Sequence, residues 1–150
     1  MDEIQKLLGH YESLSRMDAQ EEIASNYLKL IALELYNHFD LTIKNSIKTI
    51  NDKKRIECGW NQNENEKNKI QYGDTNVGWK EHLSIMAQAD IDISVVFSSN
   101  INYSDAKSQI VALKEERNKI AHQSKVSPNI SFDDLKKQLK TIDKILKHLE

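Results

Sequence analysis

Apolar residues recur at three- and four-residue intervals through most of the chain, which is the spacing of one face of an α-helix. The first run covers about residues 2–16, and a longer one extends from about residue 20 to 52 without Gly or Pro. Further runs are WKEHLSIMAQA, SDAKSQIVALKEERNKIAHQ and the segment after Pro128. The pattern predicts an all-α fold, a bundle of four to five helices around one core.

Local signals refine the later elements. The stretch DIDISVVF is rich in β-branched residues, but a single short strand would have no partner, so we predict a short helix there. Ser104 is the predicted N-cap of a helix over about 104–123, and Ser131 with Asp134 fits a capping box for the last helix. That helix carries a continuous apolar stripe: Leu135, Leu139, Ile142, Leu146 and Leu149.

The segment over about 52–78 is polar, rich in Asn and contains three of the four glycines. We interpret it as a polar loop, which in a compact domain is usually functional or mobile. A helical extension near Arg55 and a short hairpin near Tyr72 are both open alternatives. Trp60, Tyr72 and Trp79 border the segment and either stack on bases or, as we expect, anchor the loop to the core.

Composition sets outer limits on the function. The 150 residues are 39% hydrophobic and 29% charged, which predicts a single globular domain over residues 1–150. Cys58 is the only cysteine, so no internal disulfide forms, and the histidines show no ligand spacing, so we expect neither a metal nor a cofactor. No apolar run suits a signal peptide or a membrane span, which predicts a cytoplasmic protein with no membrane partner.

Charge allows only a local nucleic-acid site. The net charge of −2 argues against a protein that binds nucleic acid through its overall positive charge, but it leaves room for a site that grips a few phosphates.

The helix over about 104–123 places an arginine where its own period predicts the core. Its buried face is set by three apolar residues, Ala106, Ile110 and Leu113. The same spacing continues to positions 117 and 120, which are Arg117 and Ile120. An arginine on this stripe indicates either an internal ion pair, for example with Glu34, or a binding site.

Two further polar residues follow the arginine. Asn118 and His122 are four residues apart and share a helix face, whereas Arg117 and His122 are five apart, roughly 140° around the axis. The segment ERNKIAHQ resembles the signature of the HEPN superfamily, an arginine followed by a polar residue and then by a histidine after a short gap. The resemblance is specific over about 104–149, where the motif lies late in the chain with one amphipathic helix after it, and it implies a HEPN-like helical bundle.

The resemblance also implies an activity, metal-independent cleavage of RNA that leaves a cyclic phosphate and a 5′-hydroxyl. In that reading Arg117 donates to phosphate oxygens, His122 transfers a proton, and Asn118 orients the histidine or the phosphate. Lys114, Lys119 and Lys125 flank the motif and are candidates for substrate binding. One histidine cannot serve as base and acid at once without shuttling a proton, so we expect a homodimer whose two-fold axis brings two histidines to one cleft.

The expected setting is a bacterial defence, abortive-infection or toxin–antitoxin system, with RNA as substrate and an antitoxin or a larger defence assembly as partner. Some HEPN toxins carry a modified tyrosine two residues after the histidine, but this chain has Ser124 there. The alternative function is a non-catalytic HEPN module that binds RNA or nucleotide, or mediates dimerisation in a larger assembly.

Overall fold

The computed structural model describes residues 2–16, 21–58, 77–89, 91–97, 101–122 and 131–149. Their elements are α1 (Asp2–Arg16), α2 (Glu21–Cys58), α4 (Trp79–Gln88), α5 (Ile93–Val96), α6 (Tyr103–His122), α7 (Phe132–Leu146) and the 3-10 helix η1 (Lys147–Leu149). Every element in these ranges is helical and none is a strand, which confirms the predicted all-α fold and the short helix α5.

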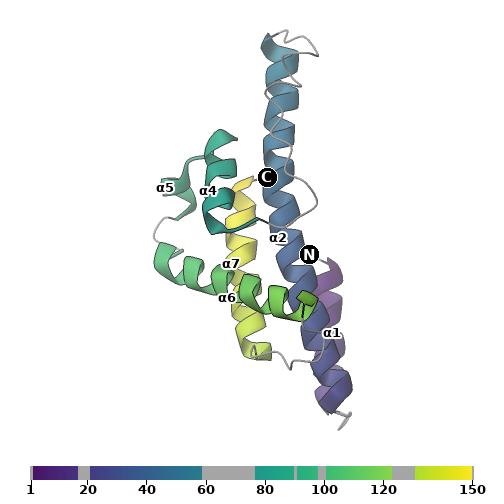
Figure 1. Cartoon of the computed structure of the whole chain (residues 1–150). Coiled ribbons are helices and arrows are strands. Elements are labelled where there is room, and N and C mark those ends of the chain that lie inside the picture. The colour runs from purple at the N-terminus through teal and green to yellow at the C-terminus, as the bar shows by residue number, and fades with distance from the viewer. Residues whose placement is uncertain are drawn as a thin grey trace.

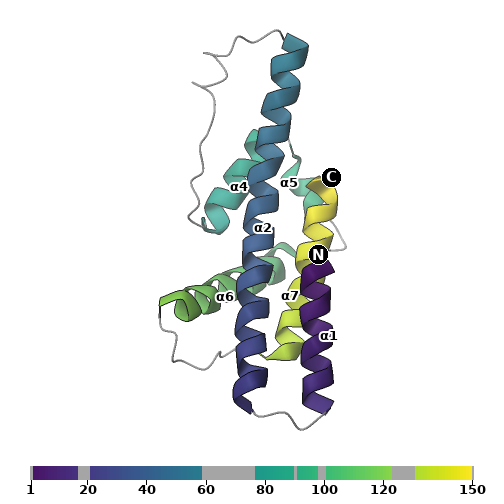
Figure 2. The ribbon, with the colours of Figure 1, turned by 90° about the vertical axis from the view of Figure 1, so that its right-hand side faces the viewer.

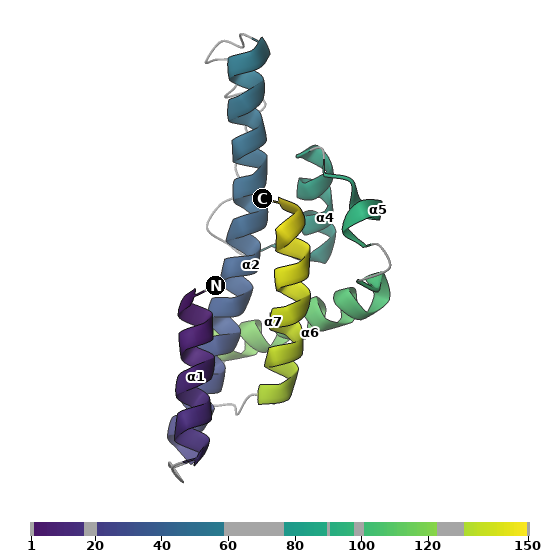
Figure 3. The ribbon, with the colours of Figure 1, turned by 180° about the vertical axis from the view of Figure 1, so that it is seen from behind.

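Helix α2 is the spine of the molecule and contacts α1, α4, α6 and α7. Helix α6 crosses α2 at a steep angle, and the C-terminal part of α2 extends beyond the other helices (Figure 1). Seen from behind, α7 runs beside α2, α1 lies next to α2, and α6 crosses on the far side of α7 and α2 (Figure 3). No helix in the described ranges is both long and apolar enough to cross a membrane.

The long helix continues further than its apolar pattern predicted. It covers Glu21–Cys58, so the first seven residues of the predicted polar loop are helical and the expected end at residue 52 is wrong. The segment DKKRIEC contains neither Gly nor Pro, and helix propensity favours its continuation until Gly59 follows in the sequence. The alternative of a helical extension near Arg55 is therefore correct, while the hairpin near Tyr72 lies outside the described residues.

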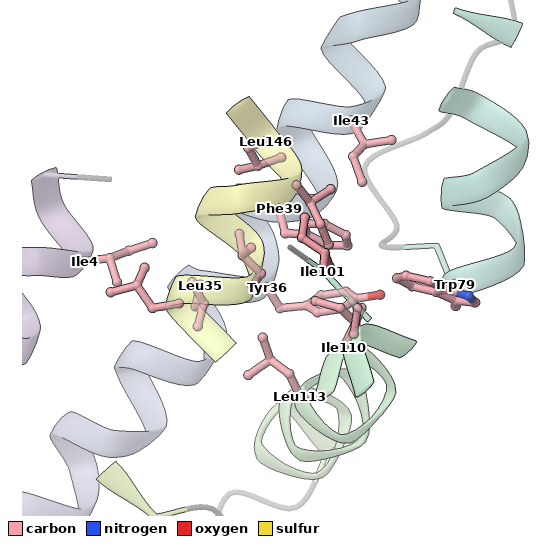
Figure 4. Close-up of a cluster of buried hydrophobic side chains, with 14 of the residues drawn as sticks. Ile4, Leu35, Tyr36, Phe39, Ile43, Trp79, Ile101, Ile110, Leu113 and Leu146 are labelled. Carbon is pink, nitrogen blue, oxygen red and sulfur yellow. The ribbon is translucent and has the colours of Figure 1, made fainter. Parts of the chain in front are cut away.

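The core lies where these helices converge on the middle of α2 (Figure 4). From α2 it takes Leu35, Tyr36, Phe39 and Ile43, all fully buried. The predicted stripe of α7 is confirmed, because Leu135, Leu139, Ile142 and Leu146 are buried and Leu149 packs against them in part. Trp79 is also buried and donates through Nε1 to the Tyr103 hydroxyl at 3.1 Å, so of its two alternatives the anchoring one holds.

The starts of the last two long helices differ in how well the sequence predicted them. The capping box of α7 is confirmed, with the Ser131 hydroxyl accepting from the Asp134 amide at 3.1 Å and Asp134 accepting from the Ser131 amide at 3.3 Å. For α6 the prediction was wrong, because Asn102 rather than Ser104 accepts from the Asp105 amide, at 3.1 Å. The helix begins one residue earlier than predicted, which places Ser104 inside its first turn.

Candidate functional site

The most buried polar residue on α6 is Glu116, and not Arg117, which the apolar spacing predicted to lie on the buried face. The apolar members of that face are buried as expected: Ala106, Ile110 and Leu113. Glu116 follows them at 6% exposure, while Arg117 and Ile120 are only partly buried. Positions 116 and 117 both fall near the apolar stripe at 3.6 residues per turn, and Lys119 reaches back to Glu116 at 3.5 Å. Arg117 therefore lies at the edge of the core and not on its central line.

The guanidinium of Arg117 has no carboxylate partner in the part of the chain that the structure describes. Its Nη1 donates to Asn118 Oδ1 at 3.2 Å, while its Nε is buried and has no hydrogen-bond partner in the described part of the chain. The ion pairs formed among the described residues do not include Arg117, and Glu34 is exposed. The alternative in which Glu34 neutralises Arg117 is therefore not what the structure shows.

His122 is the last residue of α6, and its side chain is exposed. The end of α6 lies at the edge of the molecule, on the side of α2 away from α1 and α7 (Figure 2). Within the described ranges, no hydrogen bond joins His122 to Arg117 or Asn118. The structure thus brings Arg117 and Asn118 into contact, and it places His122 at the C-terminal end of the same helix.

The three lysines proposed from the sequence have different surroundings. Lys114 is partly buried and lies four residues before Asn118, so it shares the helix face of Asn118 and His122. Lys119 is exposed and pairs with Glu116 instead. Lys125 lies outside the described residues.

Tyr36 of α2 connects the core to this part of α6. Its hydroxyl is buried and donates to the Val77 carbonyl at 2.6 Å, and Asp40 Oδ1 accepts from the Val77 amide at 3.1 Å. Burial raises the pKa of Tyr36 far above its usual value, the negative charge of Asp40 adds to this, and the positive charge of Arg117 opposes it. Two side chains of α2 therefore form hydrogen bonds with both backbone polar groups of Val77. One of them, Tyr36, also interacts electrostatically with Arg117 of α6.

A second polar cluster, which the sequence analysis missed, joins α2 to α4. Asp40 and His82 are 1% and 0% exposed, with His82 Nε2 2.8 Å from Asp40 Oδ1 and Lys44 Nζ 2.7 Å from Asp40 Oδ2. Burial alone would raise the pKa of Asp40, but hydrogen bonds from His82, Lys44 and the Val77 amide outweigh it and hold the pKa below its usual value. We call Asp40, Lys44 and His82 the buried triad; it fastens α4 to the spine.

The sequence held a signal for this triad. Asp40 lies four residues after Tyr36 on the apolar face of α2, and His82 lies between Trp79 and Ile85 at core spacing in α4. Polar residues at core positions indicate a buried pair or a site, as Arg117 did. The spacing along the chain does not predict that Asp40 and His82 are in contact.

The described residues offer no other acid–base constellation next to the motif. They contain no group of three or more His, Cys, Asp or Glu placed to hold a metal ion. A groove of about 330 Å³ between α6 and α7 is lined by four uncharged residues and by Glu115, Glu116, Asp134 and Lys137, of which Glu115 lies three residues before Asn118. The acidic residues of the lining outnumber its one lysine and oppose phosphate binding, so the polar edge around Arg117 is the better candidate for a nucleic-acid site.

Comparison with known proteins gives one match. The sequence model described as RiboL-PSP-HEPN matches residues 1–150, a range that contains every helix described above and the motif on α6. Searches of curated proteins and of solved structures gave no match.

Proposed function

The chain belongs to the RiboL-PSP-HEPN family, and from this premise we propose that it is an endoribonuclease that cleaves RNA as a homodimer without a metal ion. HEPN domains are often ribonucleases, and the fold supports that reading. The observation that carries the proposal is the polar edge of α6, where Arg117 lies beside Asn118 without a carboxylate partner among the described residues and His122 is exposed.

The chemistry uses the 2′-hydroxyl of the substrate as the nucleophile. Its oxygen bonds to the neighbouring phosphorus while the bond from phosphorus to the 5′-oxygen breaks, so the products are a cyclic phosphate and a 5′-hydroxyl. A base takes the proton of the 2′-hydroxyl, and an acid gives one to the 5′-oxygen. An imidazole performs such transfers near neutral pH, and this is the role proposed for His122.

Arg117 and Asn118 act on the phosphate in this proposal. Charge grows on the non-bridging oxygens as the new bond forms, and a guanidinium offers forked donors to them. One donor of Arg117 already meets Asn118 Oδ1 at 3.2 Å, so Asn118 restricts the orientation of the guanidinium while leaving its other donors for the substrate.

A second copy of the chain completes the site. Base and acid are both needed in one cleavage event, and one chain carries a single histidine in the motif, so we propose that two α6 ends meet across a two-fold axis. The position of this end at the edge of the molecule supports such a contact (Figure 2). An excess of inactive His122→Ala subunits should then suppress wild-type activity beyond simple dilution.

The biological part of the proposal rests on the family resemblance. We propose a bacterial defence, abortive-infection or toxin–antitoxin role in the cytoplasm, with an antitoxin or a larger defence assembly as partner. Ser124 takes the place of the modified tyrosine of some HEPN toxins, so tyrosine modification is not part of the proposal.

The test is cleavage of RNA by purified protein in the presence of a chelator. His122→Ala should lower kcat by about 10²- to 10⁴-fold while the unfolding transition is unchanged, because an exposed side chain contributes little to packing. His148→Ala is the matched control, since His148 is an exposed histidine on η1. A requirement for added Mg²⁺, or equal losses in the two variants, would overturn the proposal.

A second candidate function is a module that binds RNA or nucleotide without cutting it. The lack of any hydrogen bond between His122 and Arg117 within one chain favours this alternative. One experiment distinguishes the two functions. When protein and RNA are mixed in equal amounts, a binding module leaves the bound oligonucleotide intact, whereas an endoribonuclease cleaves it.

A further inference from the structure

Lys114 differs from an ordinary surface lysine in where its ammonium lies. From α6 the side chain reaches the start of α4, where a Cβ placed on Gly78 would lie 3.1 Å from Lys114 Nζ and 3.0 Å from Glu81 Oε2. Lys114 is partly buried, and none of the ion pairs formed among the described residues includes it. It is therefore a partly buried lysine without a carboxylate at ion-pair distance among the residues that the structure describes.

The space for this ammonium exists because position 78 has no side chain. Gly78 has φ −93° and ψ −178°, an extended conformation open to any residue, so room and not backbone conformation is what glycine provides here. The preceding residue Val77 is fixed through both its polar groups by Tyr36 and Asp40, so this backbone is held in place beside α6. The carboxylate of Glu81, which also lies at Gly78, attracts the ammonium to the same place.

Lys114 also stands in register with the candidate site. It precedes Asn118 by four residues and His122 by eight, so the three lie along one side of α6, and Lys114 is about 6 Å from Asn118 along the axis. Lys119 lacks this arrangement, because it pairs with Glu116 away from that side.

We propose that Lys114, whose ammonium lies beside Gly78, binds the RNA phosphate next to the one that is cleaved. The inference rests on the proposed ribonuclease function and adds a subsite to it, so that the enzyme prefers substrates with at least two consecutive phosphates. Lys114 binds the strand through charge and takes no part in the proton transfers.

The first test measures binding and cleavage separately. Binding of a 2′-O-methyl oligonucleotide, which cannot be cleaved, is followed by fluorescence anisotropy at several salt concentrations. Lys114→Gln should lower the slope of log K against log salt by about 0.7, the value for one contact to single-stranded nucleic acid. Lys6→Gln removes the same charge from an exposed pair with Glu3 on α1 and should leave the slope unchanged.

Cleavage then distinguishes the subsite from the reacting phosphate. On a longer RNA, Lys114→Gln should raise KM several-fold, whereas a dinucleoside monophosphate, which has one phosphate, should be cut equally well by both proteins. Equal losses on both substrates, or a salt slope like that of Lys6→Gln, would overturn the subsite. If the wild-type protein binds RNA through Lys114 but cuts neither substrate, the proposed ribonuclease function fails and the phosphate-binding position stands.

The second test moves the ammonium without removing it. In Gly78→Ala the new methyl group meets only the far ends of two flexible side chains, so the fold should be retained while Lys114 and Glu81 are displaced. The variant should weaken binding of the same oligonucleotide in the direction of Lys114→Gln. Gly9→Ala is the control, because a Cβ there has nothing within 4 Å. Wild-type binding by a folded Gly78→Ala protein would contradict the proposed position of the ammonium.

Discussion

His82 and His122 lie in opposite settings on neighbouring helices. His82 on α4 is fully buried, and its Nε2 meets a carboxylate that also contacts Lys44 and a backbone amide. His122 at the end of α6 is exposed. The buried triad and the polar edge of α6 therefore share a residue type, histidine, in opposite environments.

The difference between these two regions lies in the pairing of their charged groups, because each region also contains a buried nitrogen without a hydrogen-bond partner among the described residues, His82 Nδ1 and Arg117 Nε. A buried polar group stabilises a fold only when partners replace the water it loses, and in the triad the carboxylate of Asp40 has such partners. On α6 the Nε of Arg117 is buried without a partner, an arrangement that ordinarily costs about 1–3 kcal/mol. Local conflicts of this kind concentrate where a ligand supplies the missing partner.

The largest effect on stability is expected from Asp40→Asn. The substitution keeps the shape of the side chain but removes the charge that faces Lys44 and His82, so the free energy of unfolding should fall by about 3 kcal/mol. Urea denaturation followed by circular dichroism measures it. Asp143→Asn is the control, because its pair with Lys147 at 3.3 Å is solvent-exposed and should contribute about 0.5 kcal/mol or less. Similar losses in both variants would remove the distinction between paired core and polar edge.

The acid dependence of stability tests the same carboxylate. The pKa of Asp40 is lowered in the folded protein, so its contribution is present above the unfolded pKa of about 3.9 and is lost as the pH falls through that value towards the folded one. The stability difference between wild type and Asp40→Asn should therefore shrink as the pH falls below about 4. Urea midpoints at neutral pH and at several acidic values measure this difference. A constant difference over that range would mean that the charge of Asp40 does not stabilise the fold.

Local patterns in the sequence predicted most of the fold. The periodicity of α1 and α7 depends on near neighbours in the chain, and so does the capping box at Ser131, which is why these were predicted correctly. The cap of α6 was assigned to Ser104 instead of Asn102, since both residue types suit that role and the sequence does not fix the first turn. The end of α2 was missed because apolar periodicity fades while helix propensity persists to Cys58.

For the candidate site, too, local patterns predicted the residues but not their tertiary contacts. The identities of Arg117, Asn118 and His122 came from a local motif, but their surroundings did not. The absence of a carboxylate partner for Arg117 among the described residues depends on how α6 crosses α2. The meeting of Asp40 with His82, 42 residues apart, is likewise a tertiary fact that spacing along the chain cannot supply.

The smallest effect on stability is expected from Arg117→Met. This substitution also distinguishes the two regions most clearly, because stability and cleavage should respond to it differently. Methionine retains much of the apolar stem but removes the buried Nε–H that lacks a partner, so the free energy of unfolding should stay the same or rise by up to about 1 kcal/mol. Cleavage should fall by about 10²- to 10³-fold, because the donors to the phosphate are lost. Stability gained where activity is lost is the expected behaviour of a residue kept for function. Denaturation and cleavage assays on the same preparation measure both quantities. A loss of stability well above 1 kcal/mol would instead make Arg117 a structural residue like Asp40, and the contrast between the two regions would fail.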